Sequence, residues 1–337
     1  MKPLLQNLAE MTAHRDHLRL EVSVLSTLLH QGRDLRVRAL ELFRDGRGGP
    51  AMLRPRSWSE GGQIVSSRHE AADDPQALEL AQLPELAKCI AAGARSATRA
   101  SAEEHVLWLP VWLTDQAHAC LEVSQPRPFK RHQRDVITAV FMVYQNYQSL
   151  LDYSERDALT GLLNRKTFDE QFARKSAGAQ NAAAPGAQPV SDWLAVVDID
   201  HFKQVNDRFG HLYGDEVLIL VANRLRSQFR SQDRIFRFGG EEFVVLLRAS
   251  TLEQARQALD RLRAAIAGHE FPQVGQITVS IGFAAAHGGA PVEILGRADQ
   301  ALYHAKEHGR DQVCYYDDLL ASGALGRQVE HSEVDLF

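Results

Sequence analysis

Two groups of acidic residues in the second half of the sequence have the types and spacing needed to hold a metal ion. Asp198 and Asp200 end the apolar run WLAVVDID, and their spacing of two predicts that both carboxylates leave one face of a strand. Glu241 and Glu242 directly follow two glycines in RFGGEEF. Carboxylates gathered in this way repel one another, and a hard cation such as Mg²⁺ removes that cost. The plainer alternative for each group is a solvated strand end or an exposed hairpin tip.

Polar residues that suit a nucleotide accompany these acids. Lys203 offers a point charge for a phosphate, while Asn206 and Asp215 offer an amide and a carboxylate that match the hydrogen-bonding edge of guanine. Lys306 and Arg310, at the end of a later helix pattern, could add positive charge around a triphosphate. Each of these residues alone is more often an ordinary polar residue on a helix surface, so the inference depends on their combination.

The elements that must position these residues alternate in type. Apolar runs predict strands at 193–200, 233–238, 242–247, 276–286 and 312–316, and helical periodicity predicts helices at 214–229, 251–267 and 291–308. This order predicts an α/β domain of the α+β kind, a βαββαβ arrangement whose antiparallel-containing sheet has helices on one face. The uncharged segment 176–190, rich in Ala, Gly and Pro, predicts a flexible surface loop. We expect a disordered tail over 321–337.

The first half of the sequence follows a different pattern. We expect a helix over 1–30, strands at 35–44 and 51–58, a helix over 76–100, and a strand pair at 105–113 and 118–124. A long helix pattern without Gly or Pro then follows Pro128 and reaches Asp157. One stripe of this helix alternates spacings of four and three, as in a parallel coiled-coil seam between two copies. Its members are Val136, Val140, Val143, Tyr147, Leu150 and Ser154. The alternative is that the stripe packs only on its own domain.

Length and composition limit the classes of protein to which the chain can belong. Its 337 residues favour two domains, and 45% hydrophobic with 24% charged residues is ordinary for globular proteins. A formal net charge of −5 gives no support for nucleic-acid binding. Three scattered cysteines do not form a disulfide framework. The longest apolar stretch, 136–144, is far shorter than the roughly 20 residues of a membrane span. We therefore expect a cytoplasmic protein with no membrane span.

Five segments in a fixed order make the chemistry more specific. They are DALTGLLNR (157–165), DIDHFKQVND (198–207), GHLYGD (210–215), RFGGEEF (237–243) and ALYHAKEHGR (301–310). Together they resemble the GGDEF family of diguanylate cyclases, in which GGEEF is an accepted variant of the signature. The resemblance covers roughly residues 155–318. It implies a palm-type nucleotidyl cyclase domain, a nucleotidyltransferase that condenses two GTP molecules into cyclic di-GMP and two pyrophosphates.

The resemblance also implies three groups of residues around one bound GTP. Those expected to hold Mg²⁺, for which Mn²⁺ could substitute, are Asp198, Ile199 through its carbonyl, and Glu241. Those expected to bind the guanine and the triphosphate are Asn206, Asp215, Phe202, Lys203, Gly239, Gly240, Lys306 and Arg310. Glu241 and Glu242 are the expected catalytic pair, one of which helps to deprotonate the ribose 3′-hydroxyl.

A second site is implied for the product. Arg230 and Asp233 match the family's RxxD inhibitory site for cyclic di-GMP, and Arg261 falls where a further arginine often contributes. Because one domain binds one GTP and the product joins two, two domains must face each other, which predicts a homodimer. The alternative function is a catalytically silent receptor for cyclic di-GMP or GTP. The signature acids are all present, and this favours the enzyme.

The first half resembles a GAF sensor domain more loosely. The resemblance depends on LPVW and LEVSQPRPF, which precede the long helix, and a PAS-like domain is the alternative. The predicted division is therefore a GAF-like sensor over 1–130, a signalling helix over 131–157, a cyclase domain over 158–320 and the tail. Trp58, Trp108 and Trp112 either line a pocket for an unidentified small ligand or belong to the core.

Overall fold

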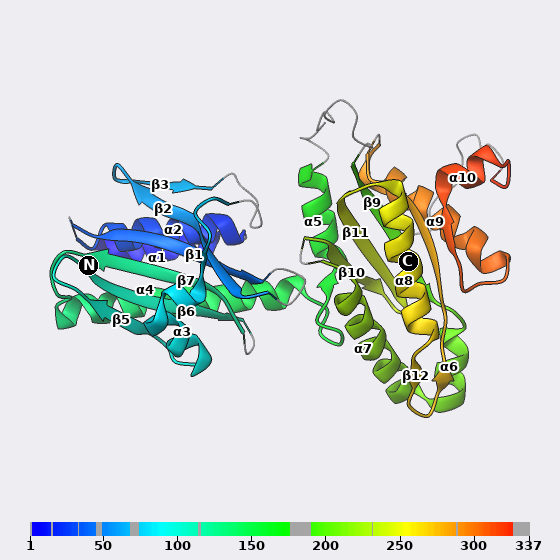
Figure 1. Cartoon of the computed structure of the whole chain (residues 1–337), viewed down its shortest axis with the longest axis horizontal. Helices are drawn as coiled ribbons and strands as arrows, with labels where there is room; N and C mark the ends of the chain where they lie inside the picture. Colours follow the sequence, from blue (N-terminus) through cyan, green and yellow to red (C-terminus); the bar gives the residue numbers. More distant parts are fainter. Residues whose placement is uncertain are drawn as a thin grey trace. The chain divides into compact units, whose positions relative to one another are not determined.

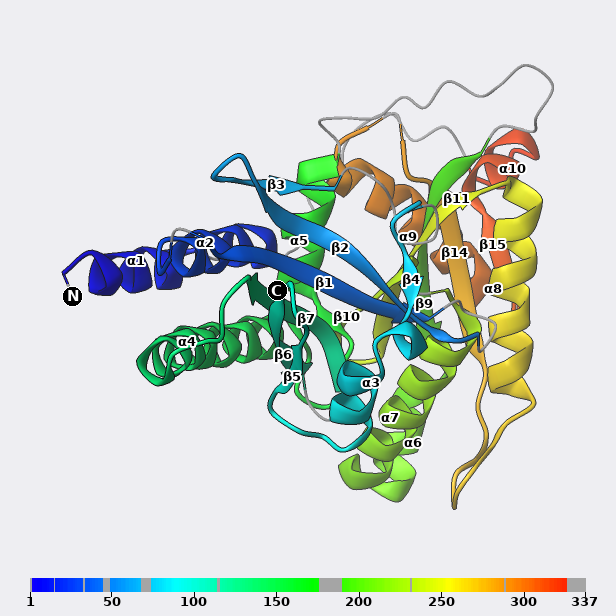
Figure 2. The same ribbon diagram turned by 60° about the vertical axis from the view of Figure 1, so that its left-hand side comes forward.

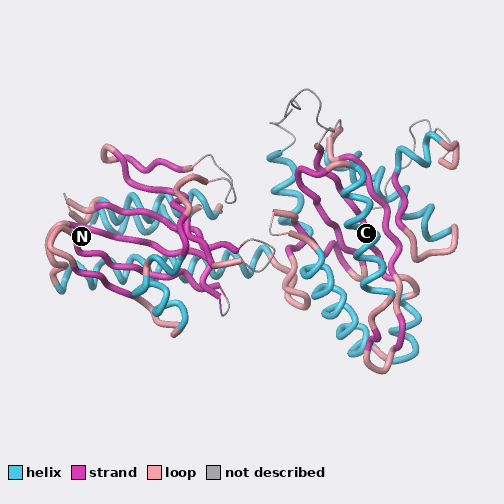
Figure 3. Tube along the Cα trace, viewed as in Figure 1, coloured by secondary structure: helices cyan, strands magenta, loops and turns pink. Residues whose placement is uncertain are grey.

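The chain folds into two compact units, Met1–Ser154 and Glu155–Phe337, each with its own sheet (Figure 1). The structure is a computed structural model that describes residues 2–14, 16–32, 34–44, 49–67, 74–113, 116–175, 190–230, 232–287 and 289–325. The predicted loop at 176–190 and most of the predicted tail lie outside the described residues. Both units mix helices and strands, so the predicted α/β class is confirmed (Figure 3).

The first unit is built on an antiparallel sheet with the strand order β3-β2-β1-β7-β6-β5. The strands are β1 (Arg36–Arg44), β2 (Ala51–Glu60), β3 (Gln63–Ser66), β5 (Ala97–Ala100), β6 (His105–Leu113) and β7 (Gln116–Gln125), and β4 (Leu78–Glu79) pairs with β2. Three helices, α1 (Lys2–Ala13), α2 (His17–Leu29) and α4 (Arg131–Glu155), pack in one apolar cluster against β1, β6 and β7 (Figure 2). A smaller cluster on other residues of these strands lies under α3 (Pro84–Ala91).

Two helix predictions in the first unit are wrong. The helix expected over 1–30 is interrupted, because Asp16 takes an extended conformation and accepts hydrogen bonds from the amides of Leu18 and Arg19, which starts α2 anew. The helix expected over 76–100 is β4, a 3₁₀ turn at Leu80–Gln82, α3 and β5. Pro84 at the start of α3 and Gly93, with a positive φ just after its end, confine the helix to two turns.

The stripe predicted as a coiled-coil seam on α4 lies largely inside its own unit. Val140 is buried, and Val136, Val143 and Tyr147 pack against the same apolar cluster as α1 and α2. Leu150, at 62% exposure, and Ser154 face solvent. The seam as predicted is therefore wrong for these four residues, and the alternative of packing on the domain itself is right. A helix that lies on a sheet buries the same three-and-four spacing as one that pairs with a partner, so the spacing could not separate the two.

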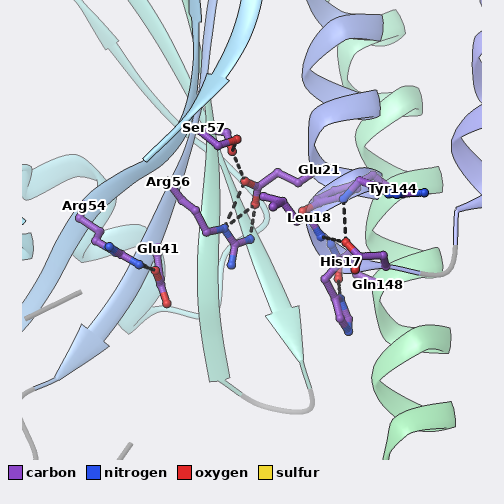
Figure 4. A network of polar contacts seen from close by, with 12 residues as sticks. His17, Leu18, Glu21, Glu41, Arg54, Arg56, Ser57, Tyr144 and Gln148 are labelled. Atoms are coloured by element: carbon purple, nitrogen blue, oxygen red, sulfur yellow. Dashed lines mark hydrogen bonds and ion pairs between the residues drawn. The ribbon is translucent and has the colours of Figure 1, made fainter. Parts of the chain in front are cut away.

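A buried ion pair fixes α2 to the sheet of the first unit (Figure 4). Glu21 is fully buried, and its carboxylate accepts hydrogen bonds from the Arg56 Nε at 3.0 and 3.2 Å and from the Ser57 hydroxyl at 2.8 Å. Tyr144 of α4 accepts a hydrogen bond from Gln148 at 2.9 Å. Burial, and then the nearby Glu21 charge, raise the pKa of Tyr144. A hydrogen bond between His17 of α2 and Gln148 joins α4 to the same helix, so the network holds α2, β2 and α4 in one arrangement.

We expect Arg56→Ala to destabilise the first unit by about 2–3 kcal/mol, because it leaves the Glu21 charge buried without its cation. Urea unfolding followed by circular dichroism measures the loss. The matched control is Glu104→Gln, since Glu104 forms an ion pair with Arg99 in which both side chains are more than a third exposed, and its loss should cost less than about 1 kcal/mol. Equal losses for the two variants would show that the Glu21–Arg56 pair does not stabilise the fold.

The second unit is a mixed sheet with the strand order β15-β14-β9-β11-β10-β8. Its strands are β8 (Leu163–Asn164), β9 (Ser191–Ile199), β10 (Arg234–Gly239), β11 (Glu242–Ser250), β14 (Val279–Ala285) and β15 (Val313–Tyr315), and a small hairpin joins β12 (Glu270–Phe271) to β13 (Gly275–Gln276). Its helices are α5 (Arg165–Lys175), α6 (Phe202–Phe209), α7 (His211–Gln228), α8 (Leu252–Ala267), α9 (Pro291–Glu307) and α10 (Tyr316–Ala321).

Helices cover both faces of this sheet, so the expectation of helices on one face is wrong. Ala195 and Val197 of β9 pack with α6, α7 and α8, whereas Leu194 and Val196 of the same strand pack with α5 and α9. An uninterrupted apolar run is typical of a strand buried on both faces. The double covering holds β9 rigidly at the centre of the unit, and β9 carries the first acidic group at its end.

Candidate active site

Strand register brings the two acidic groups together. β9 and β11 are antiparallel, and Glu242 lies directly opposite Asp198. Gly239 and Gly240, both with positive φ, form the turn that reverses the chain between β10 and β11, and Glu241 completes it. Like charges placed opposite each other on neighbouring strands destabilise a sheet. The register therefore brings one member of each acidic group together and creates a local demand for positive charge.

The acids of this cluster hold protons more tightly than usual. Burial and then repulsion from Asp198 raise the pKa of both Glu241 and Glu242. Burial also raises the pKa of Asp198, although the hydrogen bond from Lys306 opposes the shift. Asp299 of α9 belongs to the same electrostatic cluster, because its charge contributes to the raised pKa of Glu242. Sequence reasoning missed Asp299, which no short motif links to the other acids.

Lys306 supplies the positive charge that this cluster needs. Its Nζ lies 2.9 Å from Asp198 Oδ2, and the Asp198 side chain is only 5% exposed. α9 packs on the sheet through Ala298 and Leu302, and this contact fixes the direction from which the lysine reaches the acid. The sequence placed Lys306 near a triphosphate, whereas in the structure its ion pair is with the acid.

The donor set at the end of β9 suits Mg²⁺. Asp198 and Glu241 offer two carboxylates, and the Ile199 carbonyl offers a third hard oxygen at the end of the strand. Mg²⁺ typically takes one or two carboxylates and leaves its other positions to water and substrate phosphates. Among the residues that the structure describes, no three His, Cys, Asp or Glu side chains converge on a point that would hold a metal. The arrangement therefore fits an ion shared with a phosphate rather than an ion enclosed by protein.

Asp200 does not share a strand face with Asp198, although its spacing suggested that it would. β9 ends at Ile199, so the alternation of faces does not extend to Asp200. The Asp200 carboxylate accepts hydrogen bonds from Thr278 Oγ1 and Ser280 Oγ, each at 2.7 Å, and from the amide of Asp311 at 3.1 Å. It joins the end of β9 to β14 and to the approach to β15. The prediction of a common face with Asp198 is therefore wrong, and Asp200 is structural.

The residues expected to bind guanine lie where α6 meets α7. The two helices are joined at Gly210, and the Asn206 side chain lies against Gly214 so closely that an added Cβ would be 2.0 Å from Asn206 Oδ1. Asp215 is the next residue of α7 and is exposed. The structure thus places the amide and the carboxylate on neighbouring helices. A glycine at 214 is needed for this approach.

The residues expected around the triphosphate do not share one environment. Lys203 and Arg310 are exposed, and Arg310 follows the end of α9 with a positive φ. Phe202, in contrast, has its side chain buried in the core with α7, so it could meet a triphosphate only through its backbone N–H at the start of α6. An aromatic residue at the first position of α6 has an apolar cluster within reach, and burial there is more favourable than exposure to a polar ligand.

The entry turn, residues 157–162, is tied to the signature turn by one arginine. Asp157 accepts hydrogen bonds from the Thr160 amide and hydroxyl at 2.8 and 2.7 Å and from Arg237 Nη1 at 2.9 Å. Arg237 also donates to the Gly240 carbonyl at 2.8 Å. Burial opposes ionisation of Asp157, but these hydrogen bonds outweigh it and hold its pKa below the usual range. Asp157 and Arg237 lie in two of the motifs found in the sequence, but the motifs alone assign no role to either residue.

Arg165 is a second cation beside the signature turn that sequence reasoning did not single out. It stands at the start of α5, with its guanidinium 5.4 Å from the centre of the Phe238 ring. Its charge also favours the ionised form of Glu242. Phe238 in turn packs edge-on against Phe168 of α5. The turn that carries Glu241 and Glu242 is therefore supported from α5 as well as from the entry turn.

The residues expected to bind product lie around the C-terminus of α7. Both Asp233 carboxylate oxygens accept backbone hydrogen bonds at 3.0 Å, one from Arg230 and one from Arg248. Burial raises the pKa of Asp233. Arg261 of α8 donates to the Gln228 carbonyl at 2.9 Å and to its side chain at 3.1 Å. The structure therefore gathers all three residues at one end of α7, with Arg230 exposed.

The crowding of acids predicts that Glu242→Gln stabilises the second unit in the absence of a metal, by about 0.5–1 kcal/mol, because it removes the like charge opposite Asp198. Since the pKa of Glu242 is raised in the folded protein, the folded protein binds this proton more tightly than the unfolded chain. The stability of the unchanged protein should therefore rise as the pH falls through that raised pKa, and the advantage of the variant should shrink.

Urea unfolding in EDTA at neutral pH and at pH 5 tests this prediction. The control is Glu216→Gln, because Glu216 is exposed on α7. A loss of stability in Glu242→Gln at neutral pH would show that the carboxylate has a favourable partner that outweighs the repulsion.

Comparison with known proteins gives a family match over almost the whole of the second unit. Residues 154–312 match the family model described as diguanylate cyclase, GGDEF domain. The chain is 50% identical over 161 residues to the diguanylate cyclase DgcP of Pseudomonas aeruginosa, a match that covers 47% of this chain and 23% of DgcP. It is 35% identical over 185 residues to DgcZ of Escherichia coli, covering 54% of this chain and 60% of DgcZ. The chain thus spans less than two thirds of these curated relatives.

Among solved structures, the chain is similar to the GGDEF domain of DgcB from Caulobacter crescentus, which was solved in complex with c-di-GMP. The identity is 34%, the match covers 48% of this chain and 96% of that one, and the TM-score is 0.44.

Within the described ranges, every helix is too short or too polar to cross a membrane.

Proposed function

We propose that the GGDEF domain formed by residues 154–312 makes this chain a diguanylate cyclase, which condenses two GTP molecules into cyclic di-GMP and two pyrophosphates. One observation carries the proposal. The register of β9 and β11 places Asp198 opposite Glu242, beside Glu241 and the Lys306 ammonium. Phosphoryl transfer depends on positioning and charge neutralisation, and this arrangement supplies both.

The chemistry follows from the chain's own groups. Asp198, the Ile199 carbonyl and Glu241 would hold Mg²⁺, which when bound neutralises phosphate charge and favours attack at the α-phosphorus. Glu242, with its raised pKa, is suited to accept the proton of the ribose 3′-hydroxyl, because a base is most effective when its pKa approaches the working pH. Lys306 places a positive charge beside the acids in the absence of substrate. When GTP binds, the same ammonium group could form an ion pair with its phosphates.

Incubation of the purified chain with GTP and Mg²⁺, followed by nucleotide chromatography, tests the activity. Glu241→Gln and Glu242→Gln should each lower the rate of synthesis by at least about 100-fold, the usual contribution of a cation ligand or general base. Glu216→Gln, an exposed acid on α7, is the charge-matched control. Unchanged synthesis in both signature variants would reject the assignment, and GTP binding without turnover in the unchanged protein would favour the silent receptor.

Guanine recognition by Asn206 can be tested without substituting Asn206 itself. In Gly214→Ala the new Cβ would lie 2.0 Å from Asn206 Oδ1, so the amide must move, while the helix gains a better helix former. We expect affinity for a non-hydrolysable GTP analogue to fall about tenfold, the value of one hydrogen bond. Stability should change little, because the gain in helix propensity is opposed by a contact of the new Cβ with Phe202 Cζ at 3.3 Å in the core. Gly296→Ala in α9 is the control, since no atom lies within 4 Å of its added Cβ. Equal affinities in calorimetry would separate Asn206 from guanine binding.

Synthesis requires two domains, so we also propose that the chain acts as a homodimer through the outer face of α4. One domain offers one set of GTP residues, and the product contains two nucleotides. Most of the seam predicted from the sequence packs in the unit's own core, but Leu150 of that seam forms an exposed apolar edge of α4 with Met142 and Tyr153. Met142, Leu150 and Tyr153 are 53%, 62% and 75% exposed, and a group of exposed apolar side chains on one face is typical of an interaction surface.

The variant Met142→Glu with Tyr153→Glu should give folded protein that is monomeric and at least about tenfold less active, because like charges in a helix pair cannot be relieved without separation. Light scattering and an activity assay on the same sample measure both effects. Val65→Glu, at an exposed apolar position on β3, is the control. A dimer with normal synthesis would place the contact elsewhere.

We also propose that the first unit controls the rate of synthesis and that cyclic di-GMP bound at Arg230 and Asp233 inhibits it.

A further inference from the structure

A series of hydrogen bonds, joined between Gln228 and Arg226 by the last turn of α7, connects the product-binding residues to the signature turn within a single domain. Its first link is between α8 and the end of α7, where Arg261 donates to the Gln228 carbonyl and side chain. Gln228 is the last residue of α7, and Arg230 follows it by two residues. A ligand that engages Arg261 therefore competes with the bonds that hold the C-terminus of α7.

The second link is Arg226, which lies in the last turn of α7. Its Nη2 donates to the carbonyl of Thr160 in the entry turn, and its Nη1 donates to Asn223 Oδ1 at 2.9 Å. Gly161 has a positive φ, and an added Cβ there would lie 3.0 Å from the same Nη2, so the turn and the arginine are in close contact. Movement of the end of α7 therefore acts directly on the entry turn.

The third link leads from the entry turn to the acids. Thr160 donates to Asp157 through its amide and its hydroxyl, Asp157 accepts from Arg237, and Arg237 donates to the Gly240 carbonyl. Glu241 is the next residue. A shift of the entry turn thus reaches the residue that precedes the catalytic pair through charge-assisted hydrogen bonds, which are short and directional.

We propose that Arg226 couples product binding to catalysis by transmitting displacement of the α7 terminus through the entry turn to Gly240. The inference rests on the proposed function, since it takes cyclic di-GMP as the ligand of Arg230, Asp233 and Arg261. In this proposal Arg226 is a positioning residue that acts through the Thr160 carbonyl. Arg156 donates to the Gly161 carbonyl of the same turn, so two like charges meet there, and burial and then this repulsion lower the pKa of Arg226. A ligand that displaced the end of α7 would shift this contact from one arrangement to another.

The test compares Arg226→Gln with Arg224→Gln. Both replace an arginine of α7 by glutamine, but Arg224 bonds to His269 and lies off the route. Saturating cyclic di-GMP should slow the unchanged protein and the Arg224 variant at least about tenfold and the Arg226 variant less than about threefold, within the usual range of coupling between sites. Calorimetry should show that the product affinity of all three proteins agrees within about threefold.

Three results would overturn the inference. They are unchanged inhibition in Arg226→Gln, as expected if product acts only by bridging two domains; a loss of product affinity that matches the loss of inhibition; and a lack of product binding by the unchanged protein. Thr160→Val, which removes only the hydroxyl link to Asp157, should give a weaker effect in the same direction.

Hydrogen exchange keeps the test independent of synthesis. Product should change the exchange of residues 157–162 and 237–242 in the unchanged protein and not in Arg226→Gln. A protein that binds product without making it would reject the proposed activity alone, and the exchange measurement would still decide the route. Absence of any change in these two segments on product binding would reject the route even if the enzyme is active.

Discussion

Asp198 and Glu242 face each other across two antiparallel strands, and each carboxylate is partly withdrawn from water next to a like charge. This repulsion is the constraint on which the second unit depends. It is tolerated because β9 is clamped by apolar side chains on both faces and because Lys306 reaches Asp198 from α9. A sheet with a weaker core would relieve the repulsion by moving the strands apart, and the acids would then no longer meet at one point.

The parts of the site that sequence reasoning could predict are those set by local geometry. The pair of glycines before Glu241 and Glu242 requires a tight turn, and this turn fixes the register of β10 against β11. Because this relation involves neighbouring residues, it can be predicted without the tertiary structure, whereas the pairing of β11 with β9 that places Glu242 opposite Asp198 joins residues distant in the sequence. The helix predicted over 76–100, in contrast, is too long, because the ends of α3 depend on Pro84 and Gly93 rather than on periodicity.

The remaining features depend on partners that are distant in the sequence. The spacing of Asp200 suggested a metal ligand, but its partners Thr278, Ser280 and Asp311 are supplied by other elements. The apolar stripe on α4 has the predicted period, but it packs on its own unit and not on a second copy of the helix, since either a sheet or a second helix can cover such a stripe. Asp157 and Arg237 lie 80 residues apart, and only the fold makes them an ion pair. Periodicity reports that a face is covered, not what covers it.

The entry turn is the point at which both proposed controls of the second unit would meet. α4 ends at Glu155, and Asp157, which holds Arg237, follows two residues later. The end of α7 reaches the same turn through Arg226. Arg237 links the turn to the carbonyl of Gly240 beside the acids, so either proposed signal would act on the same contacts. The polar contacts of the turn involve backbone carbonyls and a single carboxylate, while Leu162 anchors its end in the apolar cluster of α6, α7 and α8. A small shift of these polar contacts would disturb less packing than a shift of β9, which is buried on both faces of the sheet.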